Sequence, residues 1–180
     1  ALNCIKEFDS IACVVVKHAN PCGVSIGQRD IAKVFKRAFN ADKLSSFGGV
    51  VALNKTCNKQ IAEELSKVFV EIVVAPHFDI DALRILKRKK NLRVLSTGKI
   101  SKRENDIELR NIDGGVLVQD VDTSNISQSD LQHVTNKKVS EKDVSTMLFG
   151  WKVLKHIKSN AILTVKNHCT IGVGAGQVSR

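Results

Sequence analysis

The sequence predicts a globular α/β protein with parallel strands, crossover helices and free thiols, and one observation supports each part of this prediction. Short apolar runs alternate with amphipathic segments through the first hundred residues, as they do in βαβ units. The chain has 180 residues, of which 43% are hydrophobic and 26% charged, a size and balance typical of one globular domain or part of a larger one. Its five cysteines are scattered without a CxxC spacing, so we expect free, mostly buried thiols in a reducing compartment.

Hydrophobic periodicity assigns the elements of the first half in order. Runs of apolar residues predict strands, and apolar residues three or four positions apart predict helices. Asp30 is placed to cap the second helix, and Pro76 closes the third strand. On this basis strands are expected at 12–16, 48–54, 70–76 and 91–96, and helices at 1–8, 30–39, 59–69 and 79–90.

After residue 100 the alternation loosens. Two strands are expected at 106–112 and 114–120, joined at Asp113 and Gly114, and the polar stretch 121–139 is expected to be a surface loop. A helix over 140–157 begins at a Ser140 cap. The last two strands are expected at 160–167 and 169–176, with a hairpin-like turn at Asn167 and His168.

The charge balance bears on possible partners. The formal net charge is +10, and much of it lies in the run 84–93, which is either a solvated helix face or a surface for polyanions. Only 4% of residues are aromatic and tyrosine is absent, so stacking on nucleic-acid bases is not expected. No apolar run reaches membrane length and no signal peptide is visible, so we expect a cytoplasmic protein without a membrane partner.

Four positions stand out as candidates for chemistry. Lys17 and His18 follow an apolar strand and enter a turn, where an imidazole can exchange a proton and an ammonium can stabilise developing negative charge. Small residues around Gly48 suit a ligand that approaches backbone amides, and Glu71 is an acid within an apolar run. The alternatives are a surface turn for Lys17 and His18, an ordinary helix-to-strand loop for Gly48, and a solvent-facing position on an edge strand for Glu71.

Metal chemistry is not expected. His18 and Cys22 are near one another in sequence, but neither HxE nor PCxxC is present, so the pattern of the zinc deaminases is absent. The glycines at 172, 174 and 176 do not match GxGxxG, and no dinucleotide site is predicted.

Seven segments, in order, resemble those of one family. "KHANPCG", "ADKLSSFGGVVALN", "VEIVVAP", "ALRILKRKKNLRVL", "GGVLVQD", "WKVLKHIKSNAILTVKN" and "IGVGAGQVSR" are similar to the aminoimidazole carboxamide ribonucleotide (AICAR) transformylase domain of the bifunctional purine biosynthesis family. The resemblance implies a cytidine deaminase-like three-layer α/β/α sandwich with a mixed sheet and without zinc. It also implies that residues 1–180 are the first part of that domain, without its C-terminal half or the cyclohydrolase domain.

The resemblance further implies formyl transfer from 10-formyltetrahydrofolate, the co-substrate, to the amine of AICAR, on the route to inosine monophosphate. His18 would transfer the proton and Lys17 would stabilise the charged transition state. Gly48, Glu71 and Asn167, together with His18, would contact AICAR. The family implies a homodimer, and the basic surface would attract the phosphate of AICAR and the polyglutamate of folates. The alternative is a nucleotide- or anion-binding module without turnover, since this segment alone could be inactive.

Overall fold

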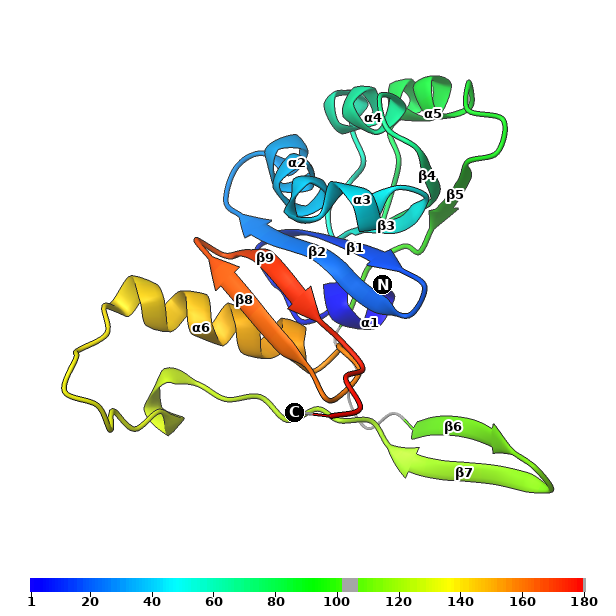
Figure 1. Ribbon diagram of the computed structural model, residues 1–180. Helices are drawn as coiled ribbons and strands as arrows, with labels where there is room; N and C mark the ends of the chain where they lie inside the picture. The colour runs from blue at the N-terminus through cyan, green and yellow to red at the C-terminus, as the bar shows by residue number, and fades with distance from the viewer. Residues whose placement is uncertain (102–106, 180) are drawn as a thin grey trace.

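The computed structural model describes residues 1–101 and 107–179, and its centre is a seven-stranded mixed sheet between two layers of helices (Figure 1). The strand order is β5-β4-β3-β1-β2-β9-β8. This arrangement confirms the expected three-layer α/β/α sandwich with a mixed sheet. The strands are β1 (Ile11–Lys17), β2 (Asn20–Gly27), β3 (Gly49–Leu53), β4 (Val70–Ala75), β5 (Arg93–Ser96), β8 (Ile162–Lys166) and β9 (Cys169–Gly174).

Helices cover both faces of this sheet. One apolar core lies between the sheet and α2, α4 and α5, and a second lies between the sheet and α1 and α6. Burial of these two cores is the main source of stability for an α/β sandwich of this size. The helices are α1 (Leu2–Ile5), α2 (Ile31–Ala41), α3 (Lys43–Ser46), α4 (Lys59–Ser66), α5 (Ile80–Leu86), α6 (Glu141–Leu154) and the 3₁₀ turn η1 (Gln128–Asp130).

Capping explains where the two longest helices begin. The Asp30 carboxylate accepts hydrogen bonds from the backbone amides of Ala32 and Lys33 at the start of α2. The Ser140 hydroxyl accepts from the amide of Asp143 at the start of α6. Both caps confirm the helix starts expected from the sequence, because each satisfies amides that have no partner within the helix.

Two expectations about the sheet were wrong. Only β3, β4 and β5 run parallel, whereas β1 pairs antiparallel with both β2 and β3. The segment after His18 was expected to be a turn because of its Asn, Pro and Gly, but it forms β2, and the turn consists of His18 and Ala19 alone. Long-range pairing overrides the local turn preference here: the Val24 amide donates to Thr170 Oγ1 at 2.9 Å.

A separate hairpin of β6 (Ile107–Ile112) and β7 (Gly115–Asp120) extends away from the sandwich (Figure 1). Its turn lies at Asp113 and Gly114, as expected. The chain then continues through an exposed stretch to α6, in agreement with the surface loop expected at 121–139. Within residues 1–101 and 107–179, no helix is long and apolar enough to cross a membrane.

The cysteines behave as the sequence predicted. All five are free thiols, and four of them are buried in the sandwich: Cys4, Cys13, Cys57 and Cys169. Burial raises the pKa of the Cys4 and Cys57 thiols to about 12 each, and the Asp79 carboxylate adds to the effect at Cys57. These thiols therefore remain protonated and chemically inert at neutral pH.

Candidate functional site

Three of the residues singled out in the sequence meet where three neighbouring strands of the sheet begin or end. Lys17 is the last residue of β1, Gly48 precedes β3, and Glu71 is the second residue of β4. The Lys17 ammonium donates a hydrogen bond to the Gly48 carbonyl at 3.1 Å. Because β1 runs antiparallel to β3 while β4 runs parallel to it, the end of β1 and the starts of β3 and β4 lie together. We call this end of the three strands, with Lys17, Gly48 and Glu71, the Lys17 edge.

Gly48 holds the centre of this group by its backbone conformation. Its φ is +67°, in the left-handed region that favours glycine, and its amide donates to the Phe69 carbonyl at 2.9 Å. A Cβ added at this position would lie 3.1 Å from Lys17 Nζ and 3.5 Å from Glu71 Oε1. The ammonium and the carboxylate therefore flank one small space beside the Gly48 backbone.

Substitution of Gly48 by alanine tests this arrangement. We expect Gly48→Ala to lower the free energy of unfolding by about 1–2 kcal/mol through its φ, and to displace the Lys17 side chain as well. Gly114→Ala is the matched control, since Gly114 also has a positive φ, +76°, but no atom lies within 4 Å of its added Cβ. Chemical denaturation should show a similar loss in the free energy of unfolding for both variants. Only Gly48→Ala should change ligand binding at the Lys17 edge.

Two β-bulges shape the same edge. Between β3 and β4, Gly49 pairs with Val70 and Val50 pairs with Ile72, so Glu71 is the unpaired residue. Between β1 and β2, the register shift leaves Cys22 unpaired in the same way. A bulge re-aims the side chain of the extra residue, which accounts for an exposed acid in an interior strand.

Cys22 lies behind the site rather than in it. Its Sγ is 3.7 Å from the hydroxyl of Ser46, which is fully buried, and it donates to the Val15 carbonyl at 3.5 Å. Burial raises the pKa of the Cys22 thiol, so the neutral form is favoured. Cys22 and Ser46 thus support the loop that carries Gly48.

An aromatic pair beside Gly48 was not found from the sequence. The rings of Phe47 and Phe69 lie 4.9 Å apart between centroids and are tilted by 41°. Their exposed fractions are 62% and 45%, which is high for phenylalanine. The only sequence signal is that each Phe precedes a predicted strand, and a separation of 22 positions along the chain hides their proximity. Such a pair offers an apolar face to a planar ring.

His18 lies next to this group but projects to solvent. It is the first residue of the two-residue turn between β1 and β2, with φ +54°. A positive φ is uncommon outside glycine, and such strained positions are frequent at functional sites. The expected Asn-Pro-Cys-Gly turn does not exist, so it does not bring the His18 ring toward Lys17. Gly23, in β2, faces the Ala38 carbonyl of α2.

Asn167 lies at a different end of the sheet. It forms the β8–β9 turn with His168, and φ values of +49° and +57° match the expected hairpin. The Ile26 amide donates to the His168 carbonyl, which places this turn near the end of β2 that is remote from His18. The distance along β2 from Asn20 to Ile26 is about 20 Å at ~3.3 Å per residue. One chain therefore does not bring Asn167 to the Lys17 edge.

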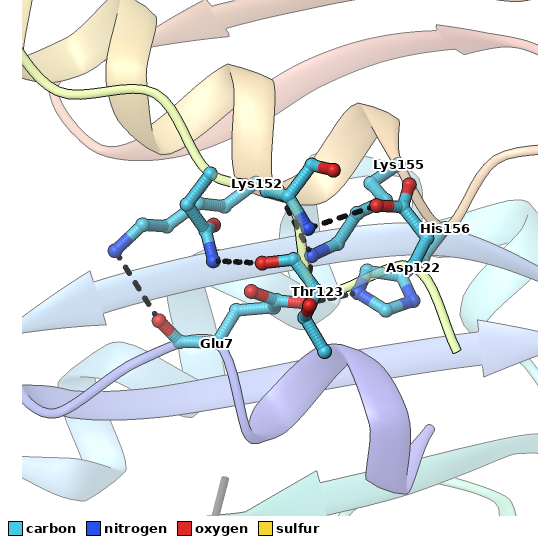
Figure 2. A network of polar contacts seen from close by, with 8 residues as sticks. Glu7, Asp122, Thr123, Lys152, Lys155 and His156 are labelled. Carbon is cyan, nitrogen blue, oxygen red and sulfur yellow. Dashed lines mark hydrogen bonds and ion pairs between the residues drawn. The ribbon is translucent and has the colours of Figure 1, made fainter. Parts of the chain in front are cut away.

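A polar cavity of about 660 Å³ lies on the other side of the β1–β2 turn. Ala19 and Pro21 line it, together with α1, the end of α6, part of the β6–β7 hairpin and residues of the segment 121–125. Figure 2 shows the polar cluster in its wall, where Glu7 Oε1 lies 2.8 Å from Lys155 Nζ and 3.0 Å from His156 Nε2. This cluster was not predictable from the sequence, because Glu7 lies about 150 positions before Lys155 and His156.

The cluster joins α1 to α6 and to the segment that follows the hairpin. Lys152 Nζ donates to the Glu7 carbonyl at 3.4 Å, and Lys155 Nζ donates to the Ser124 carbonyl at 3.4 Å. Burial would raise the pKa of the Glu7 carboxyl, but hydrogen bonds and charges from His156 and Lys155 outweigh it, so this pKa lies below its usual value. The cluster therefore stabilises the fold when Glu7 is ionised.

The lowered pKa of Glu7 predicts a pH-dependent contribution to stability. A carboxyl whose pKa is lower in the folded state stabilises above its unfolded pKa of about 4.3, and the contribution is lost as pH falls through the folded-state pKa. We expect Glu7→Gln to lower the free energy of unfolding by about 1 kcal/mol at pH 7, since the cluster is open to solvent on one side.

Urea denaturation of the wild type and Glu7→Gln at pH 7 and near pH 3 measures this difference. Glu108→Gln is a suitable control, because the described partners of Glu108, Arg110 at 3.5 Å and Gln119 at 3.1 Å, both belong to the exposed hairpin. If Glu7→Gln lowered the free energy of unfolding as much near pH 3 as at pH 7, this would contradict the stabilising role of the ionised Glu7 carboxylate.

No group of three His, Cys, Asp or Glu side chains in residues 1–101 and 107–179 is placed to hold a metal ion. The absence of a metal site in the protein stays a prediction. The groups present at the Lys17 edge are one ammonium, one carboxylate, an exposed aromatic pair and, beside them, an imidazole. This set suits a polar planar ligand that has both hydrogen-bond donors and acceptors.

Comparison with known proteins gives a consistent result over the whole chain. A family model described as the AICARFT/IMPCHase bienzyme matches residues 1–180. Bifunctional purine biosynthesis protein PurH of Oceanobacillus iheyensis is 48% identical over 180 residues, and that of Caldicellulosiruptor saccharolyticus is 44% identical over the same length. The match covers all of this chain and 35% of each relative, so the chain spans about a third of their length.

Among solved structures, dCMP deaminase from the cyanophage S-TIM5 in its apo form is similar over 48% of this chain and 79% of its own. The TM-score is 0.40 and the sequence identity is 11%.

Proposed function

Because the chain belongs to the AICARFT/IMPCHase bienzyme family, whose relatives are named bifunctional purine biosynthesis proteins, we propose that it carries part of the formyl-transfer centre for AICAR. The observation that supports this proposal most is the convergence of Lys17 and Glu71 on Gly48, beside the exposed Phe47 and Phe69. In this proposal residues 1–180 are the first part of the transformylase domain of a cytoplasmic enzyme.

The proposed reaction joins the amine of AICAR to the formyl carbon of 10-formyltetrahydrofolate. The amine nitrogen attacks this carbon, a new C–N bond forms, and the carbonyl oxygen takes up negative charge. The bond from the carbon to N10 of the folate then breaks, the carbonyl is restored, and tetrahydrofolate leaves with a proton. The amine loses one proton overall, so the reaction needs a group that accepts it and a cation near the oxygen.

The residues at the Lys17 edge fit these requirements. The Lys17 ammonium forms no ion pair with the described carboxylates, so its charge is available to the developing oxyanion. Glu71 can accept hydrogen bonds from the ligand's amine or carboxamide, and Gly48 leaves room for the ligand at its backbone. His18 is exposed at the turn, where its imidazole can act as a general base and accept the proton.

The position of Asn167 requires a second chain in this proposal. If Asn167 holds the carboxamide region of the same substrate, it must reach the Lys17 edge across about 20 Å of β2. Two copies that face each other can supply His18 from one and Asn167 from the other. We therefore propose that the enzyme is a homodimer with sites shared between copies.

A formyl-transfer assay tests the proposed function. The protein is mixed with AICAR and 10-formyltetrahydrofolate, and formylated AICAR is followed by chromatography. We expect His18→Gln to lower kcat by roughly 10²–10⁴-fold. His77→Gln, at an exposed histidine beyond the opposite end of β4, is the matched control and should leave the rate unchanged.

Two other results would overturn the proposal that this chain carries part of the formyl-transfer centre. Binding of AICAR without product would favour a nucleotide-binding module without turnover. Conversion of formylated AICAR to inosine monophosphate, without formyl transfer, would assign the chain to the other activity in the family's description.

A further inference from the structure

Arg37 of α2 binds the turn that carries Asn167. Its guanidinium donates from Nη1 to the Ile26 carbonyl at 3.2 Å and from Nη2 to the Asn167 carbonyl. Ile26 lies near the end of β2 and Asn167 in the turn between β8 and β9, so one side chain joins the helix to both segments. Hydrogen bonds from a charged donor are about twice as strong as those between neutral groups. Arg37 therefore ties the turn firmly to α2.

The guanidinium of Arg37 is committed to backbone carbonyls and not to a carboxylate. Within residues 1–101 and 107–179 it forms no ion pair, although the residue is half-buried. Partial burial of a charge costs free energy, and an apolar side chain of similar size would pack here without that cost. The two carbonyls that it binds are thus what accounts for an arginine at this position.

The other side of the turn is held by α6. His168 Nε2 lies 2.8 Å from the Ser145 hydroxyl, and the His168 ring meets Phe149 edge-on at 6.1 Å between centroids. Burial, together with the charges of Arg37 and Lys142, lowers the pKa of His168, so its neutral form is favoured. Figure 1 shows the β8–β9 turn between α2 and α6. The turn is therefore fixed from both faces of the sheet.

The backbone of the turn needs this support. Asn167 and His168 both have a positive φ, a conformation that costs an L-residue free energy and persists where surrounding contacts impose it. Arg37 and Ser145 supply these contacts. The Asn167 side chain is exposed, and within the described part of the chain no hydrogen bond engages its amide. The amide is thus available to a ligand while the backbone that carries it is fixed.

We propose that Arg37 is a positioning residue, which fixes the backbone of Asn167 so that the Asn167 amide meets the carboxamide region of AICAR. The inference deepens the proposed function and rests on it for the role of Asn167. A binding group must be held within about 0.5 Å of its productive place, and asparagine is short, so a displaced backbone displaces its amide. Arg37 does not itself contact AICAR in this proposal, because it binds carbonyls of the protein.

Calorimetric titration of AICAR into four proteins tests the role of Arg37: the wild type, Arg37→Met, Asn167→Ala and the double variant. We expect each single substitution to weaken AICAR binding roughly tenfold, the effect of one lost or misplaced polar contact. The double variant should bind as weakly as Asn167→Ala alone, because Arg37 acts through Asn167. A general loss of structure in Arg37→Met would instead add to the loss from Asn167→Ala.

Lys36→Met is the matched control. Lys36 precedes Arg37 on α2, and its ammonium pairs with Glu64 of α4 at 3.0 Å. The substitution removes the same charge from the same helix and should leave AICAR affinity unchanged. Arg37→Lys keeps the charge but lacks the planar fork that reaches two carbonyls, so roughly threefold weaker binding is expected. If circular dichroism shows Arg37→Met unfolded, Arg37→Lys takes its place in the comparison with Asn167→Ala.

Hydrogen exchange followed by mass spectrometry measures the turn without a ligand. Arg37→Met should speed amide exchange in the peptide 162–174 roughly fivefold and leave β4 unchanged. Unchanged exchange, wild-type AICAR affinity of Arg37→Met, or additive losses in the double variant would each overturn the inference. Failure of the proposed function looks different, since AICAR binding would then be absent from the wild type or unaffected by Asn167→Ala.

Discussion

Replacement of Lys17 by methionine is expected to reduce formyl transfer to AICAR by roughly 10²–10³-fold in kcat. Methionine preserves the length and apolar stem of lysine but removes the ammonium that lies 3.1 Å from the Gly48 carbonyl. The loss is large because, among the residues that the structure describes, no other cation forms a hydrogen bond at the Lys17 edge. No second positive charge therefore replaces that of Lys17 at the developing oxyanion. Steady-state kinetics with saturating substrates measure the effect on kcat directly.

Two controls make the Lys17 result specific. Lys33→Met changes a lysine that is 83% exposed on α2 and should keep wild-type kinetics. Lys17→Arg retains the charge but not the compact ammonium, so partial activity is expected. A Lys17→Met enzyme with wild-type kcat would remove Lys17 from the proposed mechanism.

The largest effect on stability is expected for Gly23→Ala. A Cβ on Gly23 would lie 2.0 Å from the Ala38 carbonyl oxygen and 2.9 Å from its carbon, and both belong to the backbone of α2. Side-chain rotation cannot relieve this overlap, so α2 must move away from β2. We expect the free energy of unfolding to fall by about 3 kcal/mol.

Thermal and urea denaturation measure the Gly23→Ala effect, and Tm should fall by roughly 6–12 °C for a chain of this length. Gly174→Ala is the matched control in the same sheet, because its added Cβ meets only the Ile162 carbonyl at an ordinary 3.8 Å. Equal stability of Gly23→Ala and Gly174→Ala would show that α2 does not pack on β2 as closely as described.

Elements with a clear local signal were predictable from the sequence. The stretch from β3 to β5 alternates apolar strands with amphipathic helices, and the structure confirms each of them. The Asp30 and Ser140 caps and the Asn167–His168 turn were also predictable, because each depends on residues within a few positions. The helix expected at 1–8 is shorter, Leu2–Ile5, since nothing in the local pattern fixes its end.

Features that depend on distant residues were not predictable. β2 was missed because its Asn, Pro and Gly favour a turn, and its strand state depends on β1 and β9 on either side. At the candidate site, the residue types were identified but their arrangement was not: the bulge that exposes Glu71 depends on register with β3, and the Phe47–Phe69 pair on a contact between two loops. The roles of these residues remain predictions.

The most direct test of the proposed site is calorimetric titration of AICAR into the wild type, Lys17→Ala and His18→Ala. The proposal predicts saturable binding to the wild type with one site per chain, and weaker binding to both variants while each remains folded. No binding by a folded wild type, or equal affinity for all three, would contradict the assignment of the nucleotide site to the edge formed by Lys17, Gly48 and Glu71.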